Sequence, residues 1–209
     1  MGSKSFIWWV GKIESPATIA DNGDATVGSM TITMDSLRAI YPTLNDNQLI
    51  VARNAHVMLL QVGLFRRAEM AIVLDRHTGA ELLIIPGDIS SIRRFVIPDY
   101  ITGEVIVVHN HPNNSTFSAS DILSFTIYSL RNVGRAVIDY LSTQGHNGNV
   151  YSISIGDGER PTMSTFVDIR DTIRNYFSHS RAAKPPESFD VINCYLCEKF
   201  GWNYRRGVD

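Results

Sequence analysis

The sequence has little cysteine, no long apolar run and no excess of charge of one sign. Two cysteines in 209 residues are too few for a disulfide framework. No segment approaches the ~20 consecutive apolar residues of a membrane-spanning helix. The first residues, MGSKSFIWWVGK, lack the apolar core and cleavage pattern of a secretory signal. We therefore expect a cytoplasmic protein without a membrane span.

The charge balance also limits the classes of partner. Nineteen Lys and Arg stand against 21 Asp and Glu, for a formal net charge of -2. The basic residues are scattered along the chain and form none of the clusters typical of nucleic-acid-binding proteins. The composition, with 44% apolar residues, is that of a globular protein whose length suits one domain with extensions.

The pattern of apolar residues and breaks divides the chain into three parts. Residues 1–44 are predicted to form an N-terminal extension with short strands, including FIWWV and ATVGSMTITM, and a short helix that Pro42 stops. Residues 45–160 are predicted to form the core, and residues 161–209 a C-terminal helical tail.

Within the core, the apolar periodicity predicts two helices and five strands. The order of these elements indicates an α/β fold of the mixed α+β kind, with a mixed central sheet flanked by helices. Asn45 or Asp46 can cap the first helix, and Gly134 can end the second. The predicted helices span residues 45–65 and 118–134, and the strands span residues 70–75, 80–85, 104–111, 136–143 and 149–156.

The stretch VVHNHPNNSTFSASD, residues 107–121, carries the strongest chemical signal. Side chains alternate across a strand, so His109 and His111 point to the same face, roughly 6.5 Å apart at the backbone. Both imidazoles can then converge on one zinc ion at bond lengths of about 2.0–2.1 Å. Pro112 ends the strand pairing, which places the pair at the open end of the predicted sheet.

Asp121 lies in the first turn of the helix that follows, where its carboxylate can supply a third ligand. Three protein ligands and one open position are typical of a catalytic zinc site. The segment SASD, from Ser118 to Asp121, is also a capping-box pattern, in which the serine and the acidic residue satisfy the start of the helix. The two interpretations do not exclude each other.

At these residues the chain resembles the JAB/MPN (JAMM) zinc metalloprotease family, and most of all its bacterial, phage-type and RadC-like branch. The family motif, His-x-His-Pro followed by Ser-x-x-Asp, appears here as His109 to Pro112 and Ser118 to Asp121. The resemblance implies a cytidine-deaminase-like core and zinc held by His109, His111 and Asp121. It implies that Ser118 stabilises the oxyanion and that an upstream glutamate is the general base. The loop before Ser118 has six residues where the family has seven.

Three glutamates are candidates for that base: Glu69, Glu81 and Glu104. In the family, the glutamate lies just after the first long helix, at the start of the first core strand, and Glu69 occupies this place. Glu81, at the start of the return strand, is the second choice. Glu104 begins the histidine strand some ~16 Å from His109, at the wrong end for proton transfer at the metal.

The resemblance implies a zinc-dependent metallo-isopeptidase or peptidase that hydrolyses an amide or isopeptide bond. Its partner would be a protein or peptide, such as a ubiquitin-like conjugate. A RadC-like DNA-associated protein and a non-catalytic scaffold of the same fold are the alternatives.

The remaining histidines and cysteines favour structural roles. His56 is predicted to be a core or boundary residue, and Cys194 and Cys197 to be small buried residues of a terminal helix. The aromatic residues of the tail are predicted to pack it onto the domain: Tyr195, Phe200, Trp202 and Tyr204.

Overall fold

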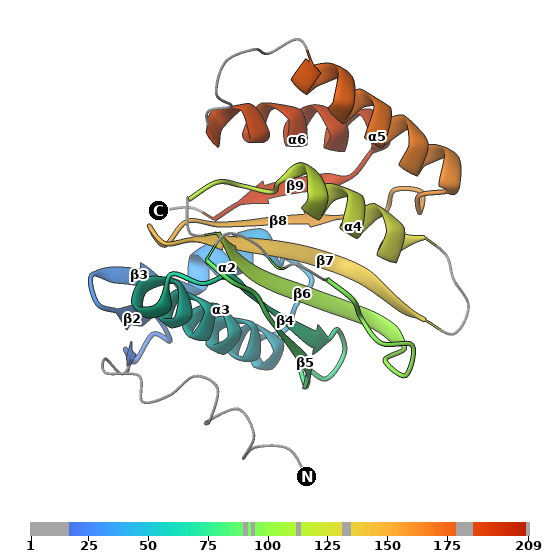
Figure 1. The fold of residues 1–209 in the computed structure, drawn as a ribbon. Helices are drawn as coiled ribbons and strands as arrows, with labels where there is room; N and C mark the ends of the chain where they lie inside the picture. The colour runs from blue at the N-terminus through green and yellow to red at the C-terminus, as the bar shows by residue number, and fades with distance from the viewer. Residues whose placement is uncertain are drawn as a thin grey trace.

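A six-stranded mixed sheet with helices on both faces forms the centre of the computed structural model (Figure 1). The structure describes residues 17–89, 92, 95–111, 114–130, 135–178 and 186–207. The strand order β5-β4-β6-β7-β8-β9 confirms the predicted mixed sheet flanked by helices. The strands are β4 (Met70–Asp75), β5 (Glu81–Pro86), β6 (Gly103–His111), β7 (Ala136–Gly145), β8 (Val150–Ser154) and β9 (Asn203–Arg206).

The centre of the sheet contains one parallel pair, β6 and β7, and every other neighbouring pair is antiparallel. A parallel pair needs a crossover connection, and helix α4 (Ala119–Ser129) supplies it on one face of the sheet (Figure 1). Helix α4 begins a few residues after β6 ends and runs back across the sheet, so its N-terminus lies at the end of β6 that carries the two histidines.

Helices α2 (Met34–Ile40) and α3 (Asp46–Arg66) cover the other face. Asn45 caps α3 through a capping box with Gln48, which confirms Asn45 as the cap. A small antiparallel sheet packs beside these helices, made of β1 (Thr18–Ile19), β2 (Ala25–Val27) and β3 (Met30–Ile32). Apolar side chains of the two helices and of β4 and β6 form one closed core, which includes Leu37, Leu59, Ile72 and Val108.

The second core lies on the α4 face. Helices α5 (Met163–Ser178) and α6 (Pro186–Phe200) pack outside α4 in the upper part of Figure 1. Their buried side chains meet those of α4 and of the sheet. The members of this core include Val107, Phe117, Phe125, Ile138, Leu141, Ile169, Leu196 and Trp202.

Two of the predicted elements need correction, and two predictions stay open. ATVGSMTITM is not one strand but a hairpin, β2 and β3, because Gly28 turns the chain with φ +60°. The tail is not only helical, because β9 pairs with β8 and covers an otherwise open edge of the sheet. FIWWV and the predicted cap Gly134 lie outside the described residues.

Helix α3 is long and apolar enough to cross a membrane by length and composition alone. In the described structure, however, 61% of its most apolar window is buried inside the fold. Burial of this kind is typical of the core helix of a globular domain, which passes the same composition test.

Candidate metal centre

His109 and His111 lie at the end of β6 on the face that α4 covers, and both are nearly inaccessible to solvent. The residue between them, Asn110, points to the opposite face, as the strand alternation predicts. Its side-chain oxygen accepts a hydrogen bond from the Met70 N–H (2.8 Å), and its amide donates to the Ala68 carbonyl (2.9 Å). Asn110 therefore fixes the chain that enters β4 against the histidine strand.

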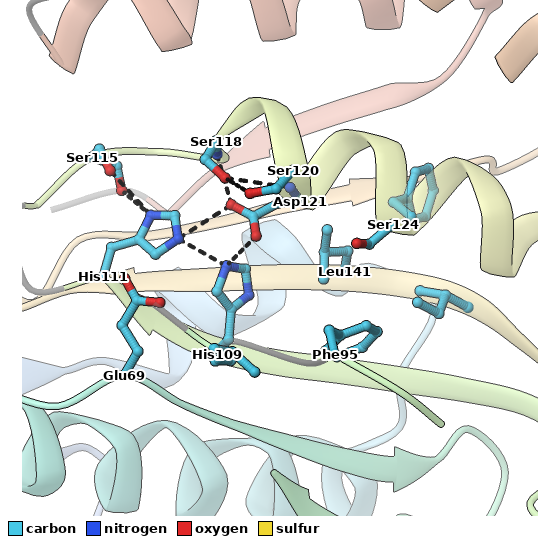
Figure 2. Close-up of a pocket in the computed structure, with 13 residues that line it drawn as sticks. Glu69, Phe95, His109, His111, Ser115, Ser118, Ser120, Asp121, Ser124 and Leu141 are labelled. Carbon is cyan, nitrogen blue, oxygen red and sulfur yellow. Dashed lines mark hydrogen bonds and ion pairs between the residues drawn. The ribbon is translucent and has the colours of Figure 1, made fainter. Parts of the chain in front are cut away.

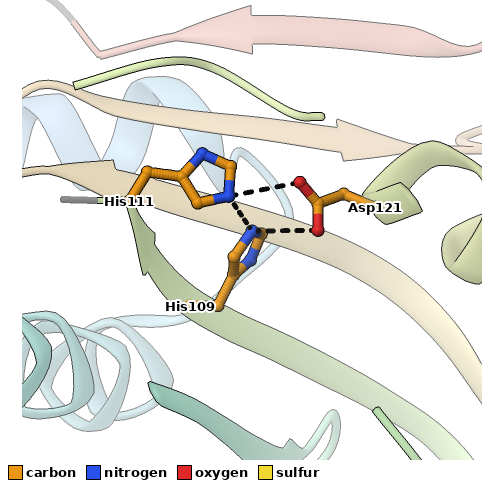
Figure 3. A group of neighbouring side chains, drawn as sticks. All are labelled: His109, His111 and Asp121. Carbon is orange, nitrogen blue, oxygen red and sulfur yellow. Dashed lines mark hydrogen bonds and ion pairs between the residues drawn. The ribbon is translucent and has the colours of Figure 1, made fainter. Parts of the chain in front are cut away.

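The capping-box interpretation of Ser118 and Asp121 is confirmed. Ser118 Oγ accepts from the Asp121 N–H (3.3 Å), and Asp121 Oδ2 accepts from the Ser118 N–H (2.7 Å). The same carboxylate faces both histidines (Figure 3). Its Oδ1 lies 3.5 Å from His109 Nε2 and its Oδ2 lies 3.2 Å from His111 Nε2. Asp121 therefore takes part in the capping box of α4 and also forms a three-residue group with His109 and His111.

The distances within this group suit a single bound metal ion. Zinc bonds of about 2.0–2.1 Å at tetrahedral angles place neighbouring ligand atoms about 3.3 Å apart. The two Nε2 atoms of His109 and His111 are 3.1 Å apart, and each faces a different oxygen of Asp121, at 3.5 Å for His109 and Oδ1 and at 3.2 Å for His111 and Oδ2 (Figure 3). Ligand atoms of all three residues lie within 4.8 Å of one another, so the group could hold a metal ion.

The hydrogen bonds around His111 also suit a metal ligand. His111 Nδ1 lies 3.1 Å from the Ser115 carbonyl oxygen and 3.1 Å from Ser115 Oγ. A proton on Nδ1, donated to that carbonyl, leaves the Nε2 lone pair directed at the centre of the group. His109 Nδ1 is buried and has no hydrogen-bond partner among the described residues.

The electrostatics of the group show close coupling. Burial raises the pKa of Asp121, but the charges and hydrogen bonds of His109 and His111 outweigh it and hold this pKa well below its usual range. Burial lowers the pKa of His111, yet the hydrogen bond and charge of Asp121, with the charge of Glu69, raise it to about 9. A divalent cation bound to this group would compete with the proton on His111.

Glu69 comes directly before β4 and lines the same cavity as the histidines (Figure 2). Burial raises its pKa, although the nearby histidines oppose that effect. Glu81 is exposed and pairs with Leu74, three residues and thus roughly 10 Å along β4 from Ala71, the partner of His109. Of these two glutamates, only Glu69 lies at the group.

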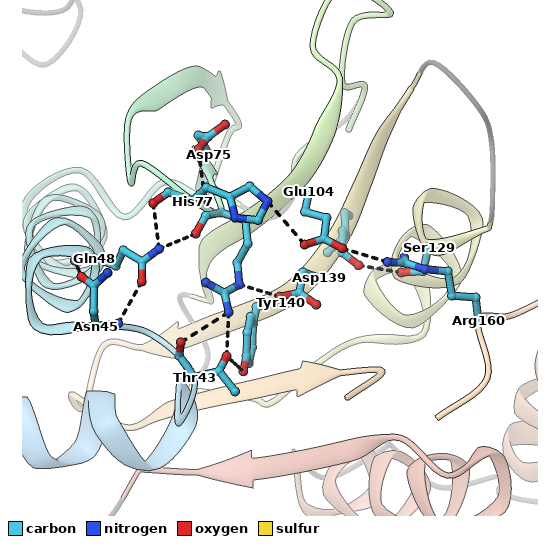
Figure 4. Close-up of polar contacts among 12 residues, drawn as sticks. Thr43, Asn45, Gln48, Asp75, His77, Glu104, Ser129, Asp139, Tyr140 and Arg160 are labelled. Atoms are coloured by element: carbon cyan, nitrogen blue, oxygen red, sulfur yellow. Dashed lines mark hydrogen bonds and ion pairs between the residues drawn. The ribbon is translucent and has the colours of Figure 1, made fainter. Parts of the chain in front are cut away.

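Glu104 lies at the opposite end of β6, as predicted. Its carboxylate pairs with Arg160 (3.1 Å) and with His77 (3.7 Å), in a polar cluster far along the sheet from the histidines (Figure 4). Nearby, Arg76 pairs with Asp139 at 2.6 Å. These contacts connect the strand ends and turns on that side, which gives Glu104 a structural role there.

The cavity has a volume of about 450 Å³ and joins two kinds of surface. Glu69, His109, His111 and Asp121 lie at one end, with the hydroxyl of Ser118 beside them (Figure 2). Apolar side chains and three further serines line the rest. A cavity of this volume can hold a segment of a substrate next to the histidine group.

The structure adds a contact that the sequence analysis missed. Asn193 of α6 is 1% exposed, and its amide donates to Thr116 Oγ1 (3.0 Å) and to the Phe117 carbonyl (3.0 Å). These residues lie between Ser115, which contacts His111, and Ser118, which caps α4. The sequence offered one signal for this contact, a polar residue between the apolar residues Ile192 and Leu196, both of which are buried. A buried amide needs hydrogen-bond partners, so an asparagine at this position indicates a polar contact inside the fold.

The structural predictions for the remaining residues are mixed. His56 is fully buried, as predicted, and contacts Tyr41 and Gln144 on the α3 face of the sheet. Cys197 is buried, but Cys194 is exposed because it lies on the solvent side of α6, so that part of the prediction was wrong. Trp202 packs against the α4 core as expected, whereas Tyr195 is 50% exposed and does not anchor the tail.

No family model, no curated protein and no solved structure matches this chain.

Proposed function

We propose that this protein is a zinc-dependent metallopeptidase or isopeptidase of the JAB/MPN (JAMM) kind. It would hydrolyse an amide or isopeptide bond in a protein substrate, for example a ubiquitin-like conjugate. The observation that carries the proposal is that His109, His111 and Asp121 bring their ligand atoms within 4.8 Å of one another, with Glu69 on the wall of the same cavity. A mixed sheet whose parallel pair is crossed by α4 supports a JAB/MPN-like core.

His109 and His111 would hold the ion through Nε2, and Asp121 through its carboxylate. When bound, zinc supplies a Lewis acid that polarises the scissile carbonyl and lowers the pKa of water. The ion pairs and hydrogen bonds already present orient these side chains, so little rearrangement is needed on binding.

Glu69 would act as general base and then as general acid. It takes a proton from the attacking water and delivers it to the departing amine. Partial burial, which raises its pKa, suits a group that must both accept and release a proton near neutral pH.

The Ser118 hydroxyl would donate one hydrogen bond to the oxyanion that forms from the scissile carbonyl. Its oxygen accepts from the Asp121 N–H and lies 2.8 Å from Ser120 Oγ. When Ser120 donates in that contact, the Ser118 proton is free to reach the oxyanion.

Metal content is the first test of the proposal. The purified full chain, after zinc addition and desalting, is expected to hold about one zinc per chain by elemental analysis, as a single three-ligand site requires. His109→Ala and Asp121→Ala should both lose it. His77→Ala removes an exposed histidine and is the matched control that should keep it. Absence of zinc in the wild type would overturn the proposal.

Hydrolysis is the second test. Glu69→Gln should keep zinc but lose at least about a hundredfold in the rate of peptide or isopeptide cleavage, the usual effect of removing a general base. Glu81→Gln, the same substitution at an exposed position, should leave both properties unchanged. A fully active Glu69→Gln protein would show that another group is the base.

A further inference from the structure

The cavity continues past the histidine group along β7 and α4. On the side of His109 away from Glu69, Figure 2 shows Phe95, Leu141 and Ser124 around the same space. Among the described residues that line the cavity, the charged ones are confined to the histidine end. The far end is therefore uncharged, and its walls are mainly aromatic and aliphatic.

The floor of this apolar end is part of the rigid core. Phe125 and Ile138 are 0% exposed and Leu141 is 4% exposed, and all three belong to the core on the α4 face. Side chains packed in this way hold one position, so the floor has a defined shape before any ligand arrives.

The remaining wall is anchored to α4 by two contacts. The ring of Phe95 meets the ring of Tyr128 edge to face, with centroids 5.6 Å apart. Two residues further on, the Ile97 N–H donates to the Tyr128 hydroxyl at 3.0 Å. These contacts position the half-buried Phe95 side chain opposite the floor, which makes the apolar end a built pocket.

We propose, resting on the proposed function, that this pocket binds an apolar side chain of the substrate next to the scissile carbonyl. The substrate class is then a peptide or isopeptide with a residue of leucine or phenylalanine type at that position. Burial of such a side chain against Leu141 and Phe95 is favourable because it removes apolar surface from water. A lysine or arginine there would lose hydration without a carboxylate beside it.

Two hydroxamates test this pocket without a known substrate. Acetohydroxamic acid and phenylacetohydroxamic acid share the metal-binding group, and only the second carries an aromatic ring. In calorimetric titrations of the zinc-loaded full chain, phenylacetohydroxamic acid should bind at least about tenfold more tightly, the range expected for added apolar groups in such pockets.

Variants of the pocket should reduce the ratio between the affinities for phenylacetohydroxamic acid and acetohydroxamic acid. Ser124→Leu fills the space from α4, and Phe95→Ala removes the opposite wall and serves as a second variant if the first does not fold. Ser164→Leu makes the same change at an exposed position of α5 and should leave the ratio as in the wild type.

The outcomes separate the pocket from the proposed function. Equal affinity for the two hydroxamates in a protein that holds zinc would overturn the pocket alone. A protein that neither holds zinc nor binds acetohydroxamic acid would overturn the proposed function and the pocket together. A tenfold preference that Ser124→Leu or Phe95→Ala removes would support both.

Discussion

Replacing Asn193 by leucine tests how the C-terminal segment supports the candidate site. Asn193 is a buried residue of α6, and its amide donates to Thr116 Oγ1 and to the Phe117 carbonyl, both at 3.0 Å. Leucine has nearly the same branched shape but no donor. The substitution therefore removes two hydrogen bonds and adds little strain.

The expected cost follows from these two contacts. A hydrogen bond contributes about 0.5–1.5 kcal/mol net, and an acceptor left buried without a partner costs about 1–3 kcal/mol. Asn193 Oδ1 is buried and has no hydrogen-bond partner within the described structure. Because the substitution also removes this unpaired acceptor, it offsets part of the cost of the two lost hydrogen bonds. We expect Asn193→Leu to lower the free energy of unfolding by about 2–3 kcal/mol.

Urea denaturation of the full chain measures this cost, and zinc titration measures its effect on the site. Because Thr116 and Phe117 lie between Ser115 and Ser118, the looser segment should also weaken zinc affinity about tenfold, as other outer-shell changes do. Cys194→Leu introduces the same residue at the next, exposed position and should change stability by less than about 0.5 kcal/mol. Equal stability of Asn193→Leu and the wild type would refute the reasoning.

Three further predictions concern charge, metal and packing. Burial lowers the pKa of His56 from 6.5 to about 4, against an opposing hydrogen bond. Below pH 6.5 His56 therefore binds a proton in the unfolded chain but not in the folded chain. The free energy of unfolding falls by up to about 3 kcal/mol towards pH 4. Urea titrations should show a smaller fall for His56→Gln but not for His77→Gln, and equal falls in all three proteins would contradict this assignment. Zinc at a hundred times its Kd should add about 2.7 kcal/mol of stability in thermal unfolding, and a chelator should reverse the gain; no shift in Tm would contradict metal binding to the folded state. A Cβ at Gly63 would lie 2.1 Å from His146 Nε2, so Gly63→Ala should cost about 1–3 kcal/mol. His146→Ala should relieve that cost in a double-mutant cycle, and additive effects would argue against the clash.

Several parts of the fold could be predicted because their causes are local. The cap at Asn45 and the capping box from Ser118 to Asp121 depend on residues close in the sequence. The strand over residues 104–111 is visible in its apolar pattern, and the common direction of His109 and His111 follows from strand alternation. The error at Cys194 arose because a Cys-x-x-Cys spacing on a helix does not tell which side faces solvent.

The sequence by itself determined that two histidines and a capping aspartate occur where a strand ends and a helix begins. Only the tertiary structure decided that the three side chains meet, because the parallel pairing of β6 with β7 makes α4 run back over the sheet from that strand end. It also decided that Glu69 lies beside them while Glu81 does not, since the hydrogen bonds of Asn110 fix the start of β4. The strand β9 depends on pairing with β8, a contact between segments about fifty residues apart that no local pattern encodes.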